Sequence, residues 1–229
     1  MLAPPDSSPW HLLTRLGEAQ IILPVLLVSL AWLLVGRADR QLVACWLGAV
    51  AAAAALTLAT KVAFIGYGIG VPVLNFTGVS GHAMFAAVVY PLLACLLAVA
   101  WPTWLRRTAL LGGVALAALI AVSRVMVGAH SASEAVAGFA LGSLASAMAM
   151  AMARQPAARP PVWLPLGLVL WLGVTPVHAP ASNTHSAVTR VALSVSGRAK
   201  PYTRGEMLRD WQRRQCVERG ASWVPPPGR

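Results

Sequence analysis

Residues 41–60 read QLVACWLGAVAAAAALTLAT and contain no charged side chain. An α-helix rises about 1.5 Å per residue, so about twenty apolar residues cross the hydrocarbon core of a bilayer, which is about 30 Å thick. This stretch therefore predicts a helix that spans a membrane.

Outward from this stretch, the chain contains five further apolar segments of similar length. They are residues 19–36, 82–101, 108–125, 135–153 and 162–177. The last segment is the shortest and contains Pro165, which makes it the weakest of the six candidates. The sequence thus predicts an all-α fold, a polytopic membrane bundle of about six transmembrane helices.

The composition excludes several classes of protein. Of the 229 residues, 58% are hydrophobic and 11% are charged, whereas a soluble domain carries about 25% charged residues. So large an apolar fraction also excludes a disordered chain. The net charge of +11 does not indicate nucleic acid binding, because the basic residues lie between apolar segments. The three cysteines lie far apart and indicate neither a disulfide framework nor a thiolate metal site.

The loops between the six segments alternate in charge. Loops on one side carry pairs of arginines, which are Arg37 and Arg40, Arg106 and Arg107, and Arg154 and Arg159. Short loops rich in arginine stay in the cytoplasm. The two longer loops, residues 61–81 and 124–134, are then expected to face outward. In a bacterium this is the periplasmic side of the inner membrane.

The expected domains are a membrane domain at residues 1–177 and a basic tail at residues 178–229. The tail carries nine Lys or Arg residues and three acids, and the parity of six spans makes it periplasmic. If the sixth segment does not cross, the tail is cytoplasmic and the two outward loops keep their side. Residues 188–195 alternate as a strand would, and residues 207–219 could form a surface helix on anionic lipid. A partly disordered tail explains the composition equally well.

One acidic residue, Glu134, lies between Asp39 and Glu206. A purely structural role as a helix cap would explain this acid, because the helix dipole is positive in the first turn. His130 lies four residues earlier, however, and positions i and i+4 share one face of a helix. The carboxylate could hold one imidazole nitrogen and leave the other as base or nucleophile. The same face continues with small residues that let a second helix approach closely: Gly138, Gly142 and Ser146.

Two cations and a Ser-Gly-His tripeptide lie on the same predicted side of the membrane. Lys61 and Arg124 stand at the outer ends of two spans, where they would either anchor the interface or bind an anion. Ser80, Gly81 and His82 open the third span, where backbone N–H groups and a hydroxyl suit an anion. A simple helix cap explains the tripeptide alone equally well.

Taken together, these residues form a candidate active site at the outer ends of spans two to five. Two histidines, two cations, an anion-binding helix start and one carboxylate suit phosphoryl transfer by a covalent route. They do not suit a two-metal phosphatase, which needs several carboxylates.

Two segments that contain these residues resemble sequence blocks of the type 2 phosphatidic acid phosphatase superfamily. Members of this superfamily are integral membrane lipid phosphatases and related acid phosphatases. That family shows Lys with Arg-Pro seven residues on, then Pro-Ser-Gly-His, then Ser-Arg-x5-His-x3-Asp. Here residues 123–134 read SRVMVGAHSASE and residues 79–82 read VSGH. In motif terms the resemblance covers about residues 61–146.

The resemblance implies a role for each matching residue. His130 would be the nucleophile, oriented by Glu134, and His82 would be the general acid that protonates the leaving oxygen. The remaining matches would hold the phosphate oxygens: Lys61, Ser80, Gly81 and Arg124. The resemblance also implies a lipid phosphate or diphosphate substrate, a phosphohistidine intermediate, and neither metal nor other cofactor.

Three positions depart from the family pattern. Glu134 stands in place of Asp, and Val79 stands in place of the Pro before Ser80. Gly68 stands seven residues after Lys61, in place of Arg, so one phosphate contact is missing. Loss of one transition-state donor lowers a rate on the order of 10²–10³-fold. We therefore expect either a slow enzyme or another group that fills the gap.

Other hypotheses remain open at the level of the sequence. A non-catalytic protein that binds or helps to transport a phosphate or lipid headgroup would explain the missing Arg, but it would not need two histidines and an acid. A vanadate-dependent haloperoxidase shares the blocks, although those relatives are soluble. A transporter unrelated to phosphate would leave the cluster as coincidence. The sequence does not choose among lipid phosphates and does not indicate an oligomeric state.

Overall fold

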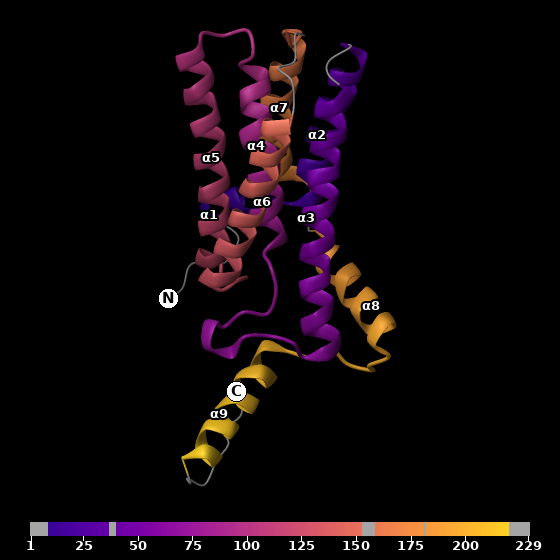
Figure 1. Ribbon diagram of the computed structural model, residues 1–229, viewed down its shortest axis with the longest axis vertical. Helices are drawn as coiled ribbons and strands as arrows, with labels where there is room; N and C mark the ends of the chain where they lie inside the picture. Colours follow the sequence, from indigo (N-terminus) through magenta and orange to yellow (C-terminus); the bar gives the residue numbers. More distant parts are fainter. Residues whose placement is uncertain (1–8, 37–39, 153–158, 181, 220–229) are drawn as a thin grey trace. The chain divides into compact units, whose positions relative to one another are not determined.

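The computed structural model describes residues 9–36, 40–152, 159–180 and 182–219, and helices account for their regular structure (Figure 1). The helices are α1 (Pro9–Arg15), α2 (Ala19–Val35), α3 (Arg40–Tyr67), the short 3-10 helix η1 (Pro72–Leu74), α4 (Gly81–Leu97), α5 (Thr103–Met126), α6 (Ala132–Met152), α7 (Trp163–His178), α8 (Thr184–Ser196) and α9 (Arg204–Glu218). Each of the six predicted segments corresponds to one helix, α2 to α7. Arg37 and Arg154 lie outside the described residues.

Three helices of the described chain are long and apolar enough to cross a membrane: α3, α5 and α6. α1 and α2 make a fourth candidate when taken as one span, bent by 43°. The two remaining apolar helices, α4 and α7, are shorter, with 17 and 16 residues, and the expected number of about six includes them. The prediction of an all-α membrane helix bundle is confirmed.

The chain forms two compact units. The first is Met1–Thr57 with Val79–Asn183, and the second is Leu58–Gly78 with Thr184–Arg229. α3 contributes residues to both, and α8 and α9 belong to the second. The domain boundary expected at residue 177 lies one residue before the end of α7 and stays a prediction.

α4 is the central helix of the first unit. Eleven of its 17 residues are buried, which is typical of a helix covered on several sides. α5, α6 and α2 pack against it, and Figure 1 shows α5 and α6 running beside it. Trp46 of α3 donates from Nε1 to the carbonyl of Val88, at 3.1 Å. The short apolar helix is therefore enclosed by its neighbours.

Glycines on α6 let that helix approach α4 closely. A β-carbon at Gly138 would collide with the carbonyl oxygen of Ser80, and one at Gly142 with the carbonyl oxygen of Met84. Ser146, four residues further along α6, is buried as well. The predicted face of small residues is therefore confirmed, and it brings the start of α6 close to the start of α4.

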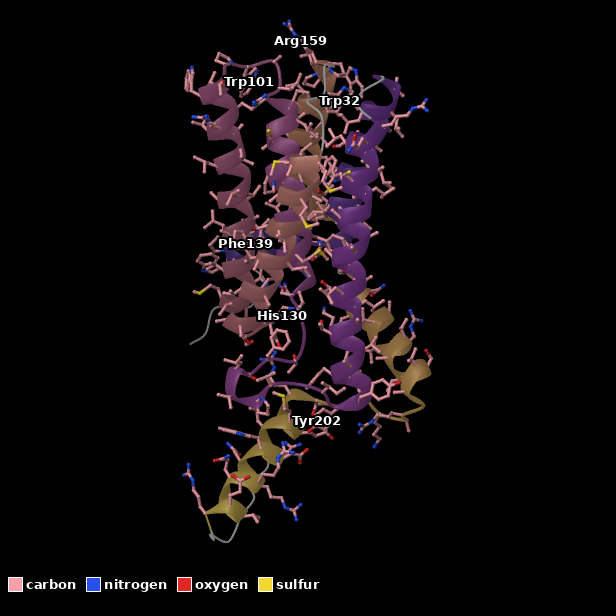
Figure 2. The ribbon with its side chains drawn as sticks, in the orientation of Figure 1. Trp32, Trp101, His130, Phe139, Arg159 and Tyr202 are labelled. Carbon is pink, nitrogen blue, oxygen red and sulfur yellow. The ribbon has the colours of Figure 1, made fainter. Side chains whose placement is uncertain are left out.

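The two ends of the first unit carry different side chains. Figure 2 places Trp32, Trp101 and Arg159 at one end and His130 toward the other. Tryptophan is enriched where helices meet the membrane–water interface. Arg159 and His130 thus lie at opposite ends of this unit.

The second unit has a small core of its own. Phe64 and Ile65 of α3 pack with Ala192 of α8 and Met207 of α9. Val188 of α8 packs against the same cluster. The strand suggested for residues 188–195 is wrong, because these residues form a helix that faces this core.

α9 begins with a capping box. The side chain of Thr203 accepts from the N–H of Glu206, and the carboxylate of Glu206 accepts from the N–H of Thr203 at 2.7 Å. The helix expected at residues 207–219 is confirmed, although it begins earlier, at Arg204, because the cap lies there.

Candidate active site

The turn between α5 and α6 positions the central residues of the site. α5 ends in a Schellman motif, in which Ala129 N–H donates to the Arg124 carbonyl at 3.1 Å and Gly128 N–H donates to the Val125 carbonyl at 2.9 Å. Gly128 has a φ of +70°, a left-handed conformation that suits glycine. The N–H of His130 also donates to the Arg124 carbonyl, at 3.1 Å. The turn thus ties the backbone of His130 to the end of α5.

His130 and Glu134 are in direct contact. Nδ1 of His130 lies 2.8 Å from Oε2 of Glu134, and the side chain of Glu134 is fully buried while that of His130 is 15% exposed. A buried carboxylate needs hydrogen-bond partners, and Oε2 also accepts from the N–H of Ser131 at 3.1 Å. Because the carboxylate accepts at Nδ1, the neutral imidazole carries its lone pair on Nε2.

The predicted pair is confirmed, but its backbone geometry differs from the expectation. α6 begins at Ala132, so His130 precedes the helix instead of sharing its face. Glu134 N–H lies 3.4 Å from Oγ of Ser131, which completes a capping box. Glu134 therefore both caps α6 and holds His130. A capping box favours Glu over Asp, which gives a physical reason for the longer acid at this position.

Ser80 connects α4 to the same turn. Its N–H donates to the backbone carbonyl of Glu134 at 3.1 Å, and α4 begins at Gly81, as predicted. The Ser80 hydroxyl is buried, makes no capping bond, and has no hydrogen-bond partner within the described chain. A buried hydroxyl without a partner calls for an explanation. A phosphate oxygen at the start of α4, next to the half-buried His82, would satisfy it.

Arg124 lies in the last turn of α5 and is half-buried. Its Nη1 donates to Oγ1 of Thr14 on α1, at 2.7 Å. Its Nε is buried and has no acceptor among the described atoms. A guanidinium has five N–H donors in a fixed plane, so the bond to Thr14 orients the remaining donors.

Lys61 belongs to the second unit, whereas the other predicted site residues belong to the first. It lies within α3, which continues to Tyr67 rather than ending near Thr60. Gly68, which stands where the family has Arg, has a φ of +73°. This backbone conformation suits glycine, so an arginine there would be strained. The local backbone conformation therefore favours glycine over the family's arginine at position 68.

Two polar contacts near the predicted residues were not expected from the sequence. Thr14 binds Arg124 across 110 residues of sequence. In the second unit, the guanidinium of Arg204 lies 3.3 Å from Oγ1 of Thr77 and 3.4 Å from the carbonyl of Asn75. Neither contact leaves a spacing pattern, because each joins distant segments. Among the described residues, no group of three or more His, Cys, Asp or Glu could hold a metal ion.

The fold and the site define a class of protein, a membrane helix bundle with a buried carboxylate–histidine pair beside an arginine and a helix start. The family model of the PAP2 superfamily matches residues 22–158, more than half of the chain. The chain belongs to this family, and membership implies a phosphatase.

A curated relative extends this similarity over most of the chain. The chain is 30% identical, over 202 residues, to an uncharacterized 22.5 kDa protein in the cps region of Klebsiella pneumoniae. The alignment covers 86% of this chain and 97% of that protein. No solved structure matches the chain significantly.

Proposed function

We propose that the protein hydrolyses a lipid phosphate or diphosphate through a phosphohistidine at His130, without a metal. The observation that carries the proposal is the 2.8 Å contact between Nδ1 of His130 and the buried carboxylate of Glu134. Such a carboxylate fixes the tautomer that has its lone pair on Nε2, and it stabilises the positive charge that develops when Nε2 attacks.

The proposed reaction has two steps. In the first, Nε2 of His130 attacks phosphorus, and the N–P bond forms while the P–O bond to the lipid breaks. His82 gives its proton to the leaving oxygen. In the second step, water attacks phosphorus, His82 accepts a proton from it, and the N–P bond breaks to release inorganic phosphate. Both histidines return to their starting states.

The charge on the phosphoryl oxygens requires donors that are in place before the reaction. The buried hydroxyl of Ser80 and the buried Nε of Arg124 support this role, since neither has a partner within the described chain. Gly81 opens α4, where backbone N–H groups suit an anion. Lys61 is proposed as a further cation for the phosphate.

The membrane bundle and the family favour a lipid as the substrate. Arg159 lies at the end of the first unit opposite His130 (Figure 2), and Arg106 and Arg107 lie near the start of α5, a few residues after Trp101 at that same end. Loops rich in arginine stay in the cytoplasm. We therefore place the protein in a bacterial inner membrane with its active site facing the periplasm.

A phosphate-release assay on the purified protein in detergent tests the proposal. Lipid phosphates and diphosphates are supplied with and without a chelator, and release is expected to be unaffected by the chelator. His130→Ala is expected to lower release by at least about 10³-fold, because no covalent intermediate can form. His185→Ala, which removes an exposed histidine of α8, is the matched control and should match the wild type. Full activity of His130→Ala would rule out the mechanism.

Gly68 favours a second candidate, a protein that binds a phosphate or lipid headgroup without hydrolysing it. The family's first-block Arg is absent, and the left-handed backbone at Gly68 does not suit one. Such a protein would bind lipid phosphate but release no inorganic phosphate, and vanadate, which mimics the five-coordinate phosphoryl group, would have no activity to inhibit.

A further inference from the structure

The break between α1 and α2 lies against two of the proposed active-site residues. A β-carbon at Gly17 would stand 2.9 Å from Cβ of His82 on α4 and 2.8 Å from Cγ2 of Ile120 on α5. Contacts this short leave room for glycine only. The backbone of the break is therefore packed directly on the helix turn that carries His82.

Thr14, in the last turn of α1 just before the break, holds the side chain of Arg124. Its Oγ1 accepts from Nη1 of Arg124 at 2.7 Å, and Thr14 is only 6% exposed. An arginine side chain has much rotational freedom, which it loses when it binds an anion. A bond that fixes the guanidinium beforehand removes part of that loss, so the anion binds more tightly.

The acid at the break is occupied by other partners. Glu18 accepts from Nε2 of Gln20 at 2.7 Å and lies 3.7 Å from Nε of Arg15. Among the described residues, no carboxylate lies within ion-pair distance of Arg124. The guanidinium of Arg124 is therefore oriented by a neutral hydroxyl, while Glu18 acts on its charge from beyond ion-pair distance.

Hydrogen bonds fix the break on both sides. The hydroxyl of Tyr90 on α4 donates to the carbonyl of Leu16 at 2.8 Å. Arg15 donates to the carbonyl of Ala179, just after α7. A segment held to α4 and to the end of α7 is a rigid support for Thr14.

We propose that Thr14 is a positioning residue for Arg124 and that the α1–α2 break forms a wall of the active site. The inference rests on the proposed function in one respect, that Arg124 binds the phosphate. It goes beyond the three sequence blocks, because Thr14 and Gly17 belong to none of them.

Two substitutions of Thr14 separate positioning from packing. Thr14→Val keeps the volume and removes the hydroxyl, whereas Thr14→Ser keeps the hydroxyl and removes a methyl group. Positioning predicts that Thr14→Val binds orthovanadate about tenfold more weakly, the effect of one charge-assisted hydrogen bond, with KM for a lipid phosphate raised similarly. Thr14→Ser should bind as the wild type does. If Thr14 acts only by packing, Thr14→Ser should bind vanadate more weakly than Thr14→Val does. That result would overturn the inference.

Vanadate binding is measured by calorimetry in detergent, so the test does not depend on turnover. Arg124→Ala is expected to weaken binding further than Thr14→Val, and adding Thr14→Val to Arg124→Ala should change nothing more. If the wild type binds vanadate but releases no phosphate, the proposed function fails while the order of the Thr14 variants still decides this inference. Equal vanadate affinity of Thr14→Val and wild type, or no binding by the wild type, would contradict it.

Discussion

At the scale of single residues, one carboxylate has two tasks. Oε2 of Glu134 accepts both from Nδ1 of His130 and from the N–H of Ser131. The first contact orients a nucleophile and the second caps a helix. The two tasks respond differently to substitution, because capping needs only an acceptor whereas a developing cation needs a negative charge.

Glu134→Gln tests this division. The amide oxygen keeps the acceptor and the volume, so we expect a melting temperature close to that of the wild type. The negative charge is lost, so kcat for a lipid phosphate should fall on the order of 10⁴-fold, as when the acid that orients a catalytic histidine is replaced by its amide. Glu134→Asp is the converse variant, with the charge kept but the cap shortened, and it should retain more activity and melt earlier. Wild-type kcat in Glu134→Gln would contradict this assignment.

The sequence predicted one contact of the candidate site but not the surroundings of that contact. The contact between His130 and Glu134 followed from their spacing. The capping turn that produces it was not predicted, although Ser131 and Glu134 have the spacing of a capping box. Thr14 could not be found at all. Its partner Arg124 is 110 residues away, and no local pattern records such a contact.

At the scale of helices, adjacent glycines on α5 give a matched test of packing against α4. A β-carbon at Gly113 would lie 2.6 Å from the carbonyl oxygen of Tyr90, whereas one at Gly112 would meet nothing within 4 Å. Gly113→Ala should therefore destabilise the protein by about 1–3 kcal/mol, as overpacking does. Gly112→Ala should be neutral or stabilising, because alanine favours the helix. Thermal unfolding in detergent distinguishes the two, and equal melting temperatures would contradict the close approach.

The cap of α9 predicts a dependence on pH. Hydrogen bonds from the side chain and backbone of Thr203 hold the pKa of Glu206 below its ordinary value of 4.5. A lowered pKa in the folded state means that the stabilisation is present above about pH 4.5 and is lost as the pH falls through the folded value. Hydrogen-exchange protection of α9, corrected for intrinsic rates, should therefore decline below about pH 4.5.

Thr203→Ala is the control for this prediction. It should reduce the stability of α9 by about 1 kcal/mol near neutral pH. It should also reduce the decline in protection on acidification, because the carboxylate of Glu206 then loses its bond to the Thr203 hydroxyl and keeps only the one to the backbone N–H. An unchanged pH profile in Thr203→Ala would assign the effect to another group.

The helices themselves were predictable, but several of their ends were not. Long apolar runs identify the segments, whereas the end of α3 depends on packing in the second unit, where Phe64 and Ile65 meet Ala192. The same core explains the wrong strand at residues 188–195. Val188 and Ala192 are four residues apart, so a helix places both against that core, although β-branched residues favoured a strand.

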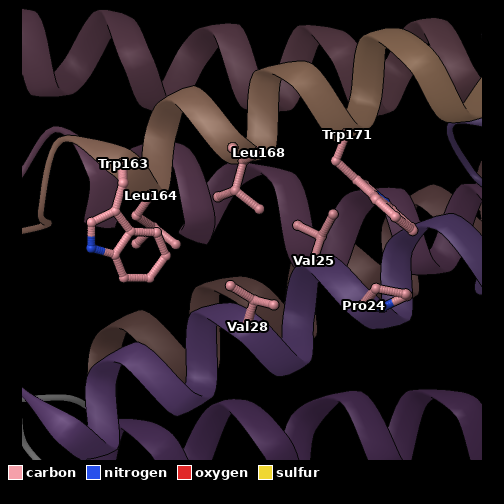
Figure 3. A pocket seen from close by; sticks show the side chains of 8 residues that line it. Pro24, Val25, Val28, Trp163, Leu164, Leu168 and Trp171 are labelled. Atoms are coloured by element: carbon pink, nitrogen blue, oxygen red, sulfur yellow. The ribbon is translucent and has the colours of Figure 1, made fainter.

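The first unit also has an apolar cavity of about 270 Å³ between α2 and α7 (Figure 3). Trp163 and Trp171 of α7 face Val25 and Val28 of α2 across it. Trp171 also donates from Nε1 to the carbonyl of Ile21, at 3.1 Å. The two helices are thus tied together beside the cavity.

At the scale of the whole molecule, the class of protein was predictable because composition and hydropathy act over the entire chain. The division into two units was not, since residues 58–78 join the C-terminal helices through contacts with no sequence pattern. The orientation in the membrane rests on the arginine loops and stays a prediction.

Single cysteines at opposite ends of the first unit test the orientation. Cys45, Cys95 and Cys216 are first replaced by serine. Ala132, exposed at the start of α6, and Ala100, exposed after α4, are then changed to cysteine one at a time. In spheroplasts, an impermeant maleimide should label Ala132→Cys at once and Ala100→Cys only after permeabilisation. The opposite pattern would place the His130 end in the cytoplasm.

The central claim is that His130 carries the phosphoryl group, and the most direct measurement is to trap it there. The purified protein is mixed with a lipid phosphate, quenched within one turnover in alkali, which preserves phosphohistidine, and digested for mass spectrometry. We predict phosphate on the peptide that contains His130, and no phosphate on the corresponding peptide of His130→Ala. Slow hydrolysis of the phosphohistidine would raise the fraction of protein that is trapped. Phosphate release at the normal rate with no phosphorylated His130 peptide, or phosphate on another residue, would contradict the central claim.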